Sequence, residues 1–131
     1  MVKNEYIFEG RLLKVGTEDK VRRKFVDDCK LEFAEKIPVC YNFDFTSPVL
    51  GHADVSRDED GLLCKLTLSD INAFSDDEYF VGGYYDRVKR HIENGVTIID
   101  SARLVSVSIV PEHGVADENL KVRRVETNAE N

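Results

Sequence analysis

The sequence predicts a mainly β protein, a small antiparallel barrel or sandwich with one or two short helices. Three observations predict this fold class. Short segments rich in β-branched and aromatic residues recur along the chain, and turn signals separate them roughly every 8–12 residues. An Asp60-Gly61 pair also stands between two such segments, as in a tight hairpin. The 131 residues suit one domain, predicted to cover residues 1–125 and to be followed by a flexible tail at 126–131.

The first half of the chain supplies four predicted strands: Tyr6–Val15, Ile37–Phe45, Val49–Arg57 and Leu62–Leu68. Gly10 interrupts the first of them, which indicates a bulge or bend. The Asp60-Gly61 turn predicts positive φ at both of its central residues. After this turn apolar and polar residues alternate, so we expect Leu66 to face the core and Lys65 to face solvent.

Two segments favour short helices. Apolar residues at helical spacing predict a helix over Asp19–Asp28, followed by extended chain. The charged stretch Asp86–Glu93 is helical in composition, and Asn94-Gly95 then resembles a helix C-cap. The acidic stretch Ser69–Glu78 reads as an exposed loop.

The second half adds four predicted strands, of which the last is the least regular. They are Tyr79–Tyr85, Val96–Asp100, Arg103–Val110 and the tail segment Leu120–Val125.

Composition and charge restrict the class of function. The 18 basic and 25 acidic residues give a net charge of −7, which argues against a general nucleic-acid binder. No apolar run is long enough to span a membrane, and no basic-then-apolar leader opens the chain, so we expect neither a membrane protein nor secretion through a signal peptide. The three cysteines form no CxxC pair, which favours reduced and mostly buried thiols.

Few residues stand out as candidates for chemistry. Ser106 and Ser108 share one face of a predicted strand, and either could form a nucleophile–base pair with His52 or His113. No GxSxG elbow supports such a pair, and small polar residues on the wetter face of a strand are the simpler interpretation. The histidines lack metal-ligand spacing, and the partial EF-hand pattern after Ser56 lacks its closing glutamate, so we expect no metal and no cofactor.

The run YFVGGYY places four large rings beside two glycines. Tyrosines are enriched at protein interfaces because an apolar ring ends in a polar hydroxyl. Packing on the protein's own barrel is the alternative. We expect part of the run to contact another subunit, through Tyr79, Phe80, Tyr84 and Tyr85.

Two stretches, Ile37–Leu68 (IPVCYNFDFTSPVLGHADVSRDEDGLLCKLTL) and Arg103–Ala116 (RLVSVSIVPEHGVA), together resemble the prohead protease, or head maturation protease, family of tailed phages. In Ile37–Leu68 the family's "IPV" strand, "IG" strand and "D-x-GL" hairpin correspond to Ile37-Pro38-Val39, Leu50-Gly51 and Asp60-Gly61-Leu62. In Arg103–Ala116 the closing strand "L-x-E-V-S-x-V-P" corresponds to RLVSVSIVP, with Ser106 where glutamate is common. Together these stretches cover about half of the chain.

This resemblance implies a herpes-assemblin-like barrel that serves virion assembly, with a serine and a histidine in the protease members. Here Phe43 precedes Asp44 where the family has its histidine, and no serine stands in the strand that carries the nucleophile. A phenyl ring cannot replace an imidazole as a general base. We therefore expect a non-catalytic structural or assembly protein of a phage or prophage head.

Its expected partners are capsid or scaffold proteins and further copies of itself. Its expected location is the host cytoplasm during assembly, and the virion is a second expected location.

Two alternatives stay open. One is a divergent serine endopeptidase that uses His52 with Ser106 or Ser108. The other is an unrelated small β domain that binds a protein or peptide along an exposed strand edge.

Overall fold

The computed structural model describes residues 5–44, 46, 49–69, 76–111 and 117–125. All regular structure in these ranges is β-strand, in eight segments. The strands are β1 (Glu5–Lys14), β2 (Arg23–Glu32), β3 (Lys36–Tyr41), β4 (Gly51–Asp58), β5 (Gly61–Ser69), β6 (Glu78–Glu93), β7 (Val96–Val110) and β8 (Lys121–Arg124).

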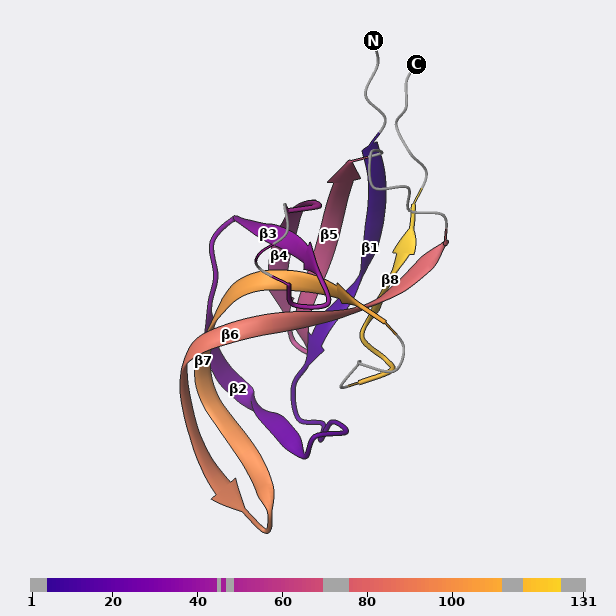
Figure 1. Cartoon of the computed structure of the whole chain (residues 1–131). Coiled ribbons are helices and arrows are strands. Elements are labelled where there is room, and N and C mark those ends of the chain that lie inside the picture. The colour runs from indigo at the N-terminus through magenta and orange to yellow at the C-terminus, as the bar shows by residue number, and fades with distance from the viewer. Residues whose placement is uncertain (1–4, 45, 47–48, 70–75, 112–116, 126–131) are drawn as a thin grey trace.

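Seven of the strands close into a barrel. The strand order is β7-β3-β4-β5-β1-β8-β6, and a further pairing of β6 with β7 completes the ring (Figure 1). β2 lies outside this ring, and among the described strands it pairs with β7 alone. The pairs are antiparallel except that β7 runs parallel to both β2 and β3. The prediction of a mainly β barrel is confirmed.

The core lies inside the ring, where alternate residues of each strand point. In β5, Leu62, Cys64, Leu66 and Leu68 are buried, whereas Lys65 is exposed, as the alternation predicts. The three cysteines are also buried and unpaired. The largest fully buried side chains come from six of the seven barrel strands and include Phe8, Leu12, Ile37, Leu66, Ile109 and Val122.

The predicted helix over Asp19–Asp28 is wrong, because β2 begins at Arg23. Phe25 and Cys29 are both buried. Side chains four positions apart lie on the same face of a strand as well as of a helix. The spacing of Phe25 and Cys29 is therefore compatible with either structure. Before β2, the Asp19 carboxylate accepts hydrogen bonds from the backbone N–H groups of Val21 and Arg23, both at 3.0 Å, which stabilises a loop instead of a helical turn.

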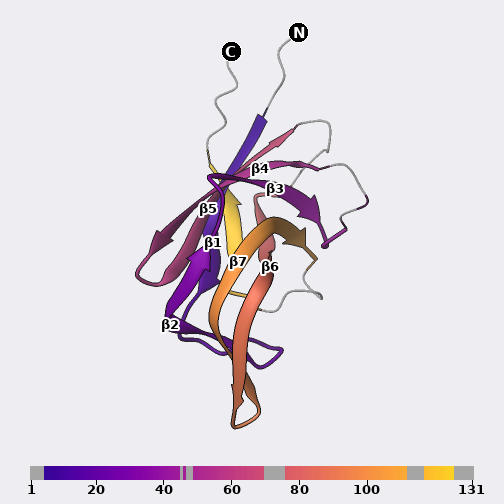
Figure 2. The same cartoon turned by 90° about the vertical axis from the view of Figure 1, so that its left-hand side faces the viewer.

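The predicted helix over Asp86–Glu93 is also wrong, because this stretch continues β6. β6 and β7 form one long hairpin whose tip extends beyond the barrel (Figures 1 and 2). Asn94 and Gly95, expected as a helix C-cap, form the two-residue turn, with φ of 52° and 79°. Positive φ at both positions is what a hairpin turn of this length needs. Both faces of this projecting part of the hairpin are open to solvent, which is why charged residues can occupy the whole segment.

The Asp60-Gly61 hairpin is confirmed, although its turn lies one residue earlier than predicted. Asp58 pairs with Gly61, so Glu59 and Asp60 form the loop. Among Asp58, Glu59, Asp60 and Gly61, the residue with a positive φ is Gly61, at 142°. A Cβ at Gly61 would collide with the backbone of Leu13. The glycine is therefore required by the close approach of β1.

Gly10 also allows a close approach, because a Cβ at this position would collide with the Lys121 carbonyl of β8. The irregularity predicted near Gly10 falls between Arg11 and Leu13 in the pairing with β5.

Candidate functional site

Two adjoining hollows lie beside β6 near Gly82 and Gly83. The first, which we call the β6 groove, has a volume of about 490 Å³ and is lined by Arg23, Phe43, Gly83, Tyr84, Tyr85, Val88, Arg90, Thr97 and Ile99. The second, which we call the barrel-end cavity, has a volume of about 180 Å³. They share Arg23, Phe43, Gly83 and Tyr85.

A strained turn after β3 places Phe43 over β6. Asn42 and Phe43 have positive φ values of 50° and 58°, which are costly for a bulky residue. The Asn42 N–H donates to the Ile109 carbonyl at 2.7 Å, and the Phe43 N–H donates to Ser108 Oγ at 2.8 Å. The ring then lies against Gly82, where a Cβ would come 3.2 Å from Phe43 Cζ. The absence of a side chain at Gly82 therefore makes room for the ring.

Ser108 is fully buried and holds this turn in place. Its hydroxyl accepts the Phe43 N–H and donates to the Ile109 carbonyl at 3.2 Å. Both the proton and a lone pair of this hydroxyl are therefore engaged with backbone groups. Such a serine is well suited to fix a loop, and poorly suited to attack a substrate.

Ser106 is also buried, and its hydroxyl has no hydrogen-bond partner among the residues that the structure describes. His52 lies on β4, half-exposed, with its Nε2 4.0 Å from the Asp54 carboxylate. β3 separates β4 from β7, so two strand spacings, about 10 Å, lie between His52 and either serine. The structure brings neither serine to His52, and His113 lies outside the described residues.

The four rings of the YFVGGYY run have different environments. Tyr79 packs edge-on against Phe8 with 5.4 Å between ring centroids, and its hydroxyl accepts the Asp76 N–H. Phe80 is half-buried, and its partners on the neighbouring strands are Val110 of β7 and Lys121 of β8. Tyr85 packs against Phe25 at 5.1 Å. Tyr84 is the ring of this run that is open to solvent, with 45% of its surface exposed.

Tyr85 and Arg23 supply the polar groups at the junction of the two hollows. Burial raises the pKa of the Tyr85 hydroxyl, which keeps it protonated at neutral pH. The hydroxyl is buried, and no described residue makes a hydrogen bond with it. Arg23 Nε donates to Asp19 at 2.9 Å, and the guanidinium lies 5.3 Å from the Phe25 ring centroid.

Other charged side chains pair away from the two hollows. Arg11 binds Asp58 through two hydrogen bonds of 2.7 and 2.8 Å, which lower the pKa of Asp58 to about 2. Arg103 binds Asp86 in the same two-bond manner, at 2.8 and 2.5 Å.

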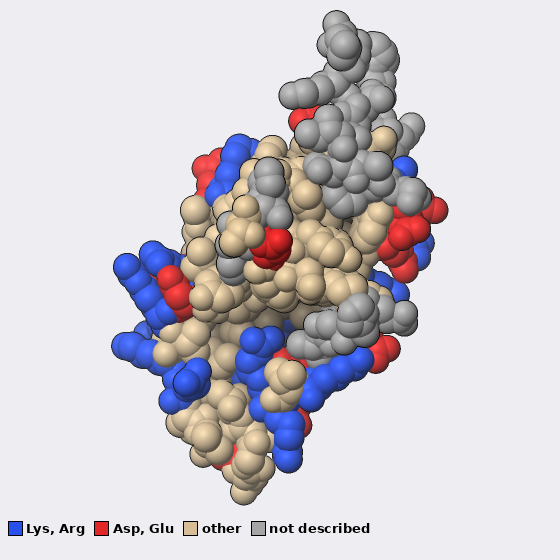
Figure 3. Space-filling model, viewed as in Figure 1, with Lys and Arg blue, Asp and Glu red and all other residues tan. Residues whose placement is uncertain are grey.

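Basic side chains gather over β2 and the base of the β6–β7 hairpin on the face shown in Figure 3, although the net charge of the chain is −7.

Among the residues described by the structure, no three His, Cys, Asp or Glu side chains converge as metal ligands. In the same part of the chain, no helix is long and apolar enough to cross a membrane.

The sequence did not predict that Phe43 and Arg23 border the two hollows. Phe43 stands where the resembling family has its histidine. Arg23 belonged to a segment predicted as helix, so its position beside Tyr85 was hidden. No local pattern signals either role, because both depend on turns that bring distant segments together.

Comparison with protein-family models, with curated proteins and with solved structures finds no match.

Proposed function

We propose that this chain is a non-catalytic assembly protein that binds other proteins, including further copies of itself, through the β6 groove. The observation that carries the proposal is the pair of exposed rings at this groove. Phe43 is 37% exposed and Tyr84 is 45% exposed, on a surface that also presents Arg23 and Arg90. Aromatic residues and arginine are the types enriched at the centres of protein interfaces.

The way in which Phe43 is held supports a binding role. The chain keeps Asn42 and Phe43 at positive φ and uses a buried serine to fix the turn. Backbone strain of this kind persists where the surrounding structure enforces it, and it is common at binding sites. A rigid ring also loses little conformational freedom when a partner covers it, so its burial contributes more to affinity.

We further propose that the assembly is a phage or prophage head, with capsid or scaffold proteins as partners. This context rests on the resemblance of the Ile37–Leu68 and Arg103–Ala116 stretches to prohead proteases, together with the barrel. Portal, terminase and capsid genes beside the gene for this chain would support the context, and their absence would count against it.

The environments of the candidate residues favour assembly over the alternative of a serine endopeptidase. Ser108 is committed to backbone hydrogen bonds, Ser106 is buried, and His52 lies two strands away from both. At the position that corresponds to the family's histidine, Phe43 faces a glycine.

Sedimentation of the purified protein over a range of micromolar concentrations tests self-association. We expect species larger than the monomer, and we expect Tyr84→Ala to reduce them because it removes the exposed ring from the groove. Ile92→Ala is the matched control, since Ile92 is also exposed but lies at the hairpin tip. A monomer at all concentrations, or equal effects of the two substitutions, would contradict the proposal.

A further inference from the structure

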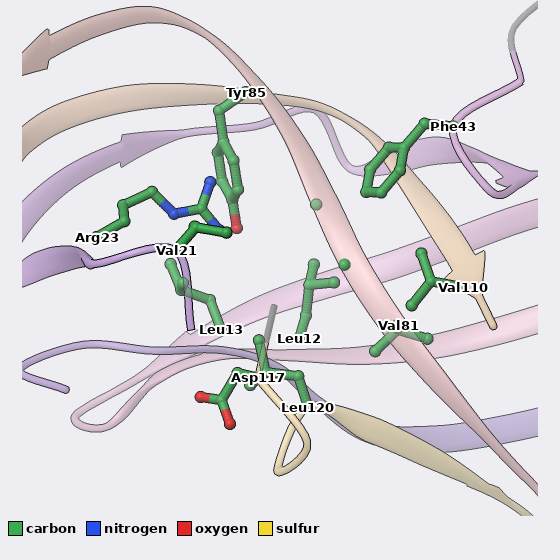
Figure 4. A pocket seen from close by; sticks show the side chains of 12 residues that line it. Leu12, Leu13, Val21, Arg23, Phe43, Val81, Tyr85, Val110, Asp117 and Leu120 are labelled. Carbon is green, nitrogen blue, oxygen red and sulfur yellow. The ribbon is translucent and has the colours of Figure 1, made fainter. Parts of the chain in front are cut away.

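One edge of β6 is left without a neighbouring strand in the described part of the chain. β7 pairs with β6 on one side as far as the hairpin turn, whereas β8 pairs on the other side with Glu78, Tyr79 and Phe80 alone. Beyond these residues β8 no longer separates β6 from the end of β1, and the barrel-end cavity lies between them (Figure 4). From Gly82 onward this edge of β6 therefore borders a hollow instead of a strand.

The backbone groups of alternate residues point to this edge. The Val81 N–H donates to the Leu120 carbonyl at 2.9 Å, on the side away from β7. Ile109, opposite Val81 in β7, also faces away from this pairing, because its carbonyl accepts the Asn42 N–H. Backbone groups two positions apart in a strand point to the same edge, so those of Gly83 do as well, and no described backbone group pairs with them there. Gly83 is partly exposed, and because it has no side chain its exposed atoms belong to the backbone.

The β6 groove follows the same edge. Gly83, Tyr84 and Tyr85 all line it, although adjacent residues of a strand direct their side chains to opposite faces. The groove is therefore open to both faces of β6 along its edge. A strand added there would place alternate side chains on the two faces, and the exposed rings of Phe43 and Tyr84 offer them apolar contacts.

The groove carries positive charge and no negative charge. Its lining includes Arg23 and Arg90 but no aspartate or glutamate. Arg23 is paired with Asp19, whereas Arg90 is exposed and forms no ion pair with any residue that the structure describes. Arg87 and Lys89, also on β6, are exposed and form no ion pair within the described ranges. Two β6 edges placed side by side would bring these cations together, so an acidic strand is a better partner than a second β6 edge.

We propose that an extended, acidic segment of a partner protein adds to β6 as a further strand at this edge. Its backbone exchanges hydrogen bonds with Gly83, its carboxylates lie beside Arg90, and its apolar side chains lie beside Phe43 and Tyr84. The inference rests on the proposed function, because it takes the β6 groove to be a protein-binding surface. It adds the conformation and the charge of the partner, and backbone pairing as the source of affinity.

The probe is a fluorescein-labelled peptide of alternating glutamate and valine residues, and its counterpart has lysine in place of each glutamate. Fluorescence anisotropy with the full chain measures both affinities. We expect saturable binding of the glutamate peptide, at least about tenfold tighter than that of the lysine peptide and weakened by salt. Arg90→Gln should weaken it about two- to fivefold, whereas Lys65→Gln, which removes a positive charge from the exposed face of β5, should leave it unchanged. Absence of saturable binding, equal affinities of the two peptides, or equal effects of the two substitutions would overturn the proposal.

Two N-methylated forms of the glutamate peptide test strand addition while the protein stays unaltered. In each form alternate backbone N–H groups are methylated, so that one edge of the extended peptide or the other can no longer donate hydrogen bonds. We expect one form to bind at least about tenfold more weakly than the unmethylated peptide, and the other form to bind equally well. Equal affinities of the two forms would overturn the proposal.

Tyr84→Ala separates a failure of strand addition from a failure of the proposed function. If this variant loses peptide binding while the two methylated forms bind equally, the groove is a protein-binding surface and strand addition alone is wrong. If the variant changes neither peptide binding nor self-association, both proposals are wrong.

Discussion

Leu66 and Lys65 are neighbours in β5 whose side chains have opposite environments. Leu66 is fully buried among core residues, and Lys65 is exposed on the outer face. Leu66→Ala removes buried apolar atoms and leaves a cavity, so we expect it to lower the free energy of unfolding by about 2–5 kcal/mol. Lys65→Ala should change it by less than about 0.5 kcal/mol. Chemical denaturation measures both, and similar losses would show that the register is wrong.

The hydroxyls of Ser106 and Ser108 are candidates for nucleophiles only if a reagent can reach them. Ser108 is 0% exposed and Ser106 is 4% exposed. Because both are covered and neither lies near His52, we expect a serine-reactive phosphonate to label neither, as read by mass spectrometry of the treated protein. We also expect no cleavage of the chain itself or of a co-expressed capsid protein. Labelling of either serine that is lost in His52→Ala would favour the endopeptidase alternative.

Residue patterns show which face of a strand is buried more reliably than they show what a side chain contacts. The alternation in Leu62–Leu68 predicts its buried face correctly, because period two is a local property of a strand. The partners of Ser108 are Phe43 and Ile109, and Phe43 lies 65 positions away in the chain. No local rule supplies such a contact, so the structural role of this serine could not be predicted.

At the scale of elements, the β6–β7 hairpin is held at its tip by a histidine between two carboxylates. His91 Nε2 lies 2.6 Å from Glu93, and Nδ1 lies 2.9 Å from Asp100. The hydrogen bonds that the His91 ring donates to the Glu93 carboxylate, which has the larger effect, and to the Asp100 carboxylate raise the pKa of His91 above its ordinary value of 6.5. Both ring nitrogens can donate only when the imidazole is protonated.

This arrangement predicts a pH-dependent hairpin tip. Because the pKa of His91 is higher in the folded chain, its stabilisation is fully present below about pH 6.5 and is lost as the pH rises through the folded-state pKa. Amide hydrogen exchange of the tip residues, compared with His91→Gln at each pH, measures the effect. We expect the parent to be better protected at acidic pH and equal to the variant at alkaline pH. A difference that grows with pH would contradict the assignment.

The elements that sequence reasoning misassigned are those with patterns shared by two structures. β2 carries apolar residues four positions apart, a spacing that a helix and a strand both satisfy. The end of β6 is charged on both faces because it extends from the barrel, so it lacks the alternation that marks a half-buried strand. Asn94-Gly95 likewise fits a helix C-cap and a hairpin turn, and only the pairing with β7 decides between them.

At the scale of the whole molecule, the barrel closes through a short strand, and this leaves room for the barrel-end cavity. β8 has four residues and joins β1 to β6 over only part of their length. Beyond its start, β1 and β6 diverge around the barrel-end cavity, and Phe43 from the β3 side and Arg23 from β2 border the opening. A barrel could be predicted from the number and spacing of the strands. The barrel-end cavity could not, because it depends on where the shortest strand begins.

We propose above that copies of the chain associate through the β6 groove. Replacing Tyr84 with the photo-reactive residue benzoylphenylalanine tests it directly, since this residue forms covalent bonds only with neighbouring groups. Replacing Ile92 in the same way gives a control at the exposed hairpin tip. On irradiation at micromolar concentration, we predict a covalent dimer from the position-84 protein and little or none from the position-92 protein. No dimer from position 84, or equal yields from both positions, would contradict the claim.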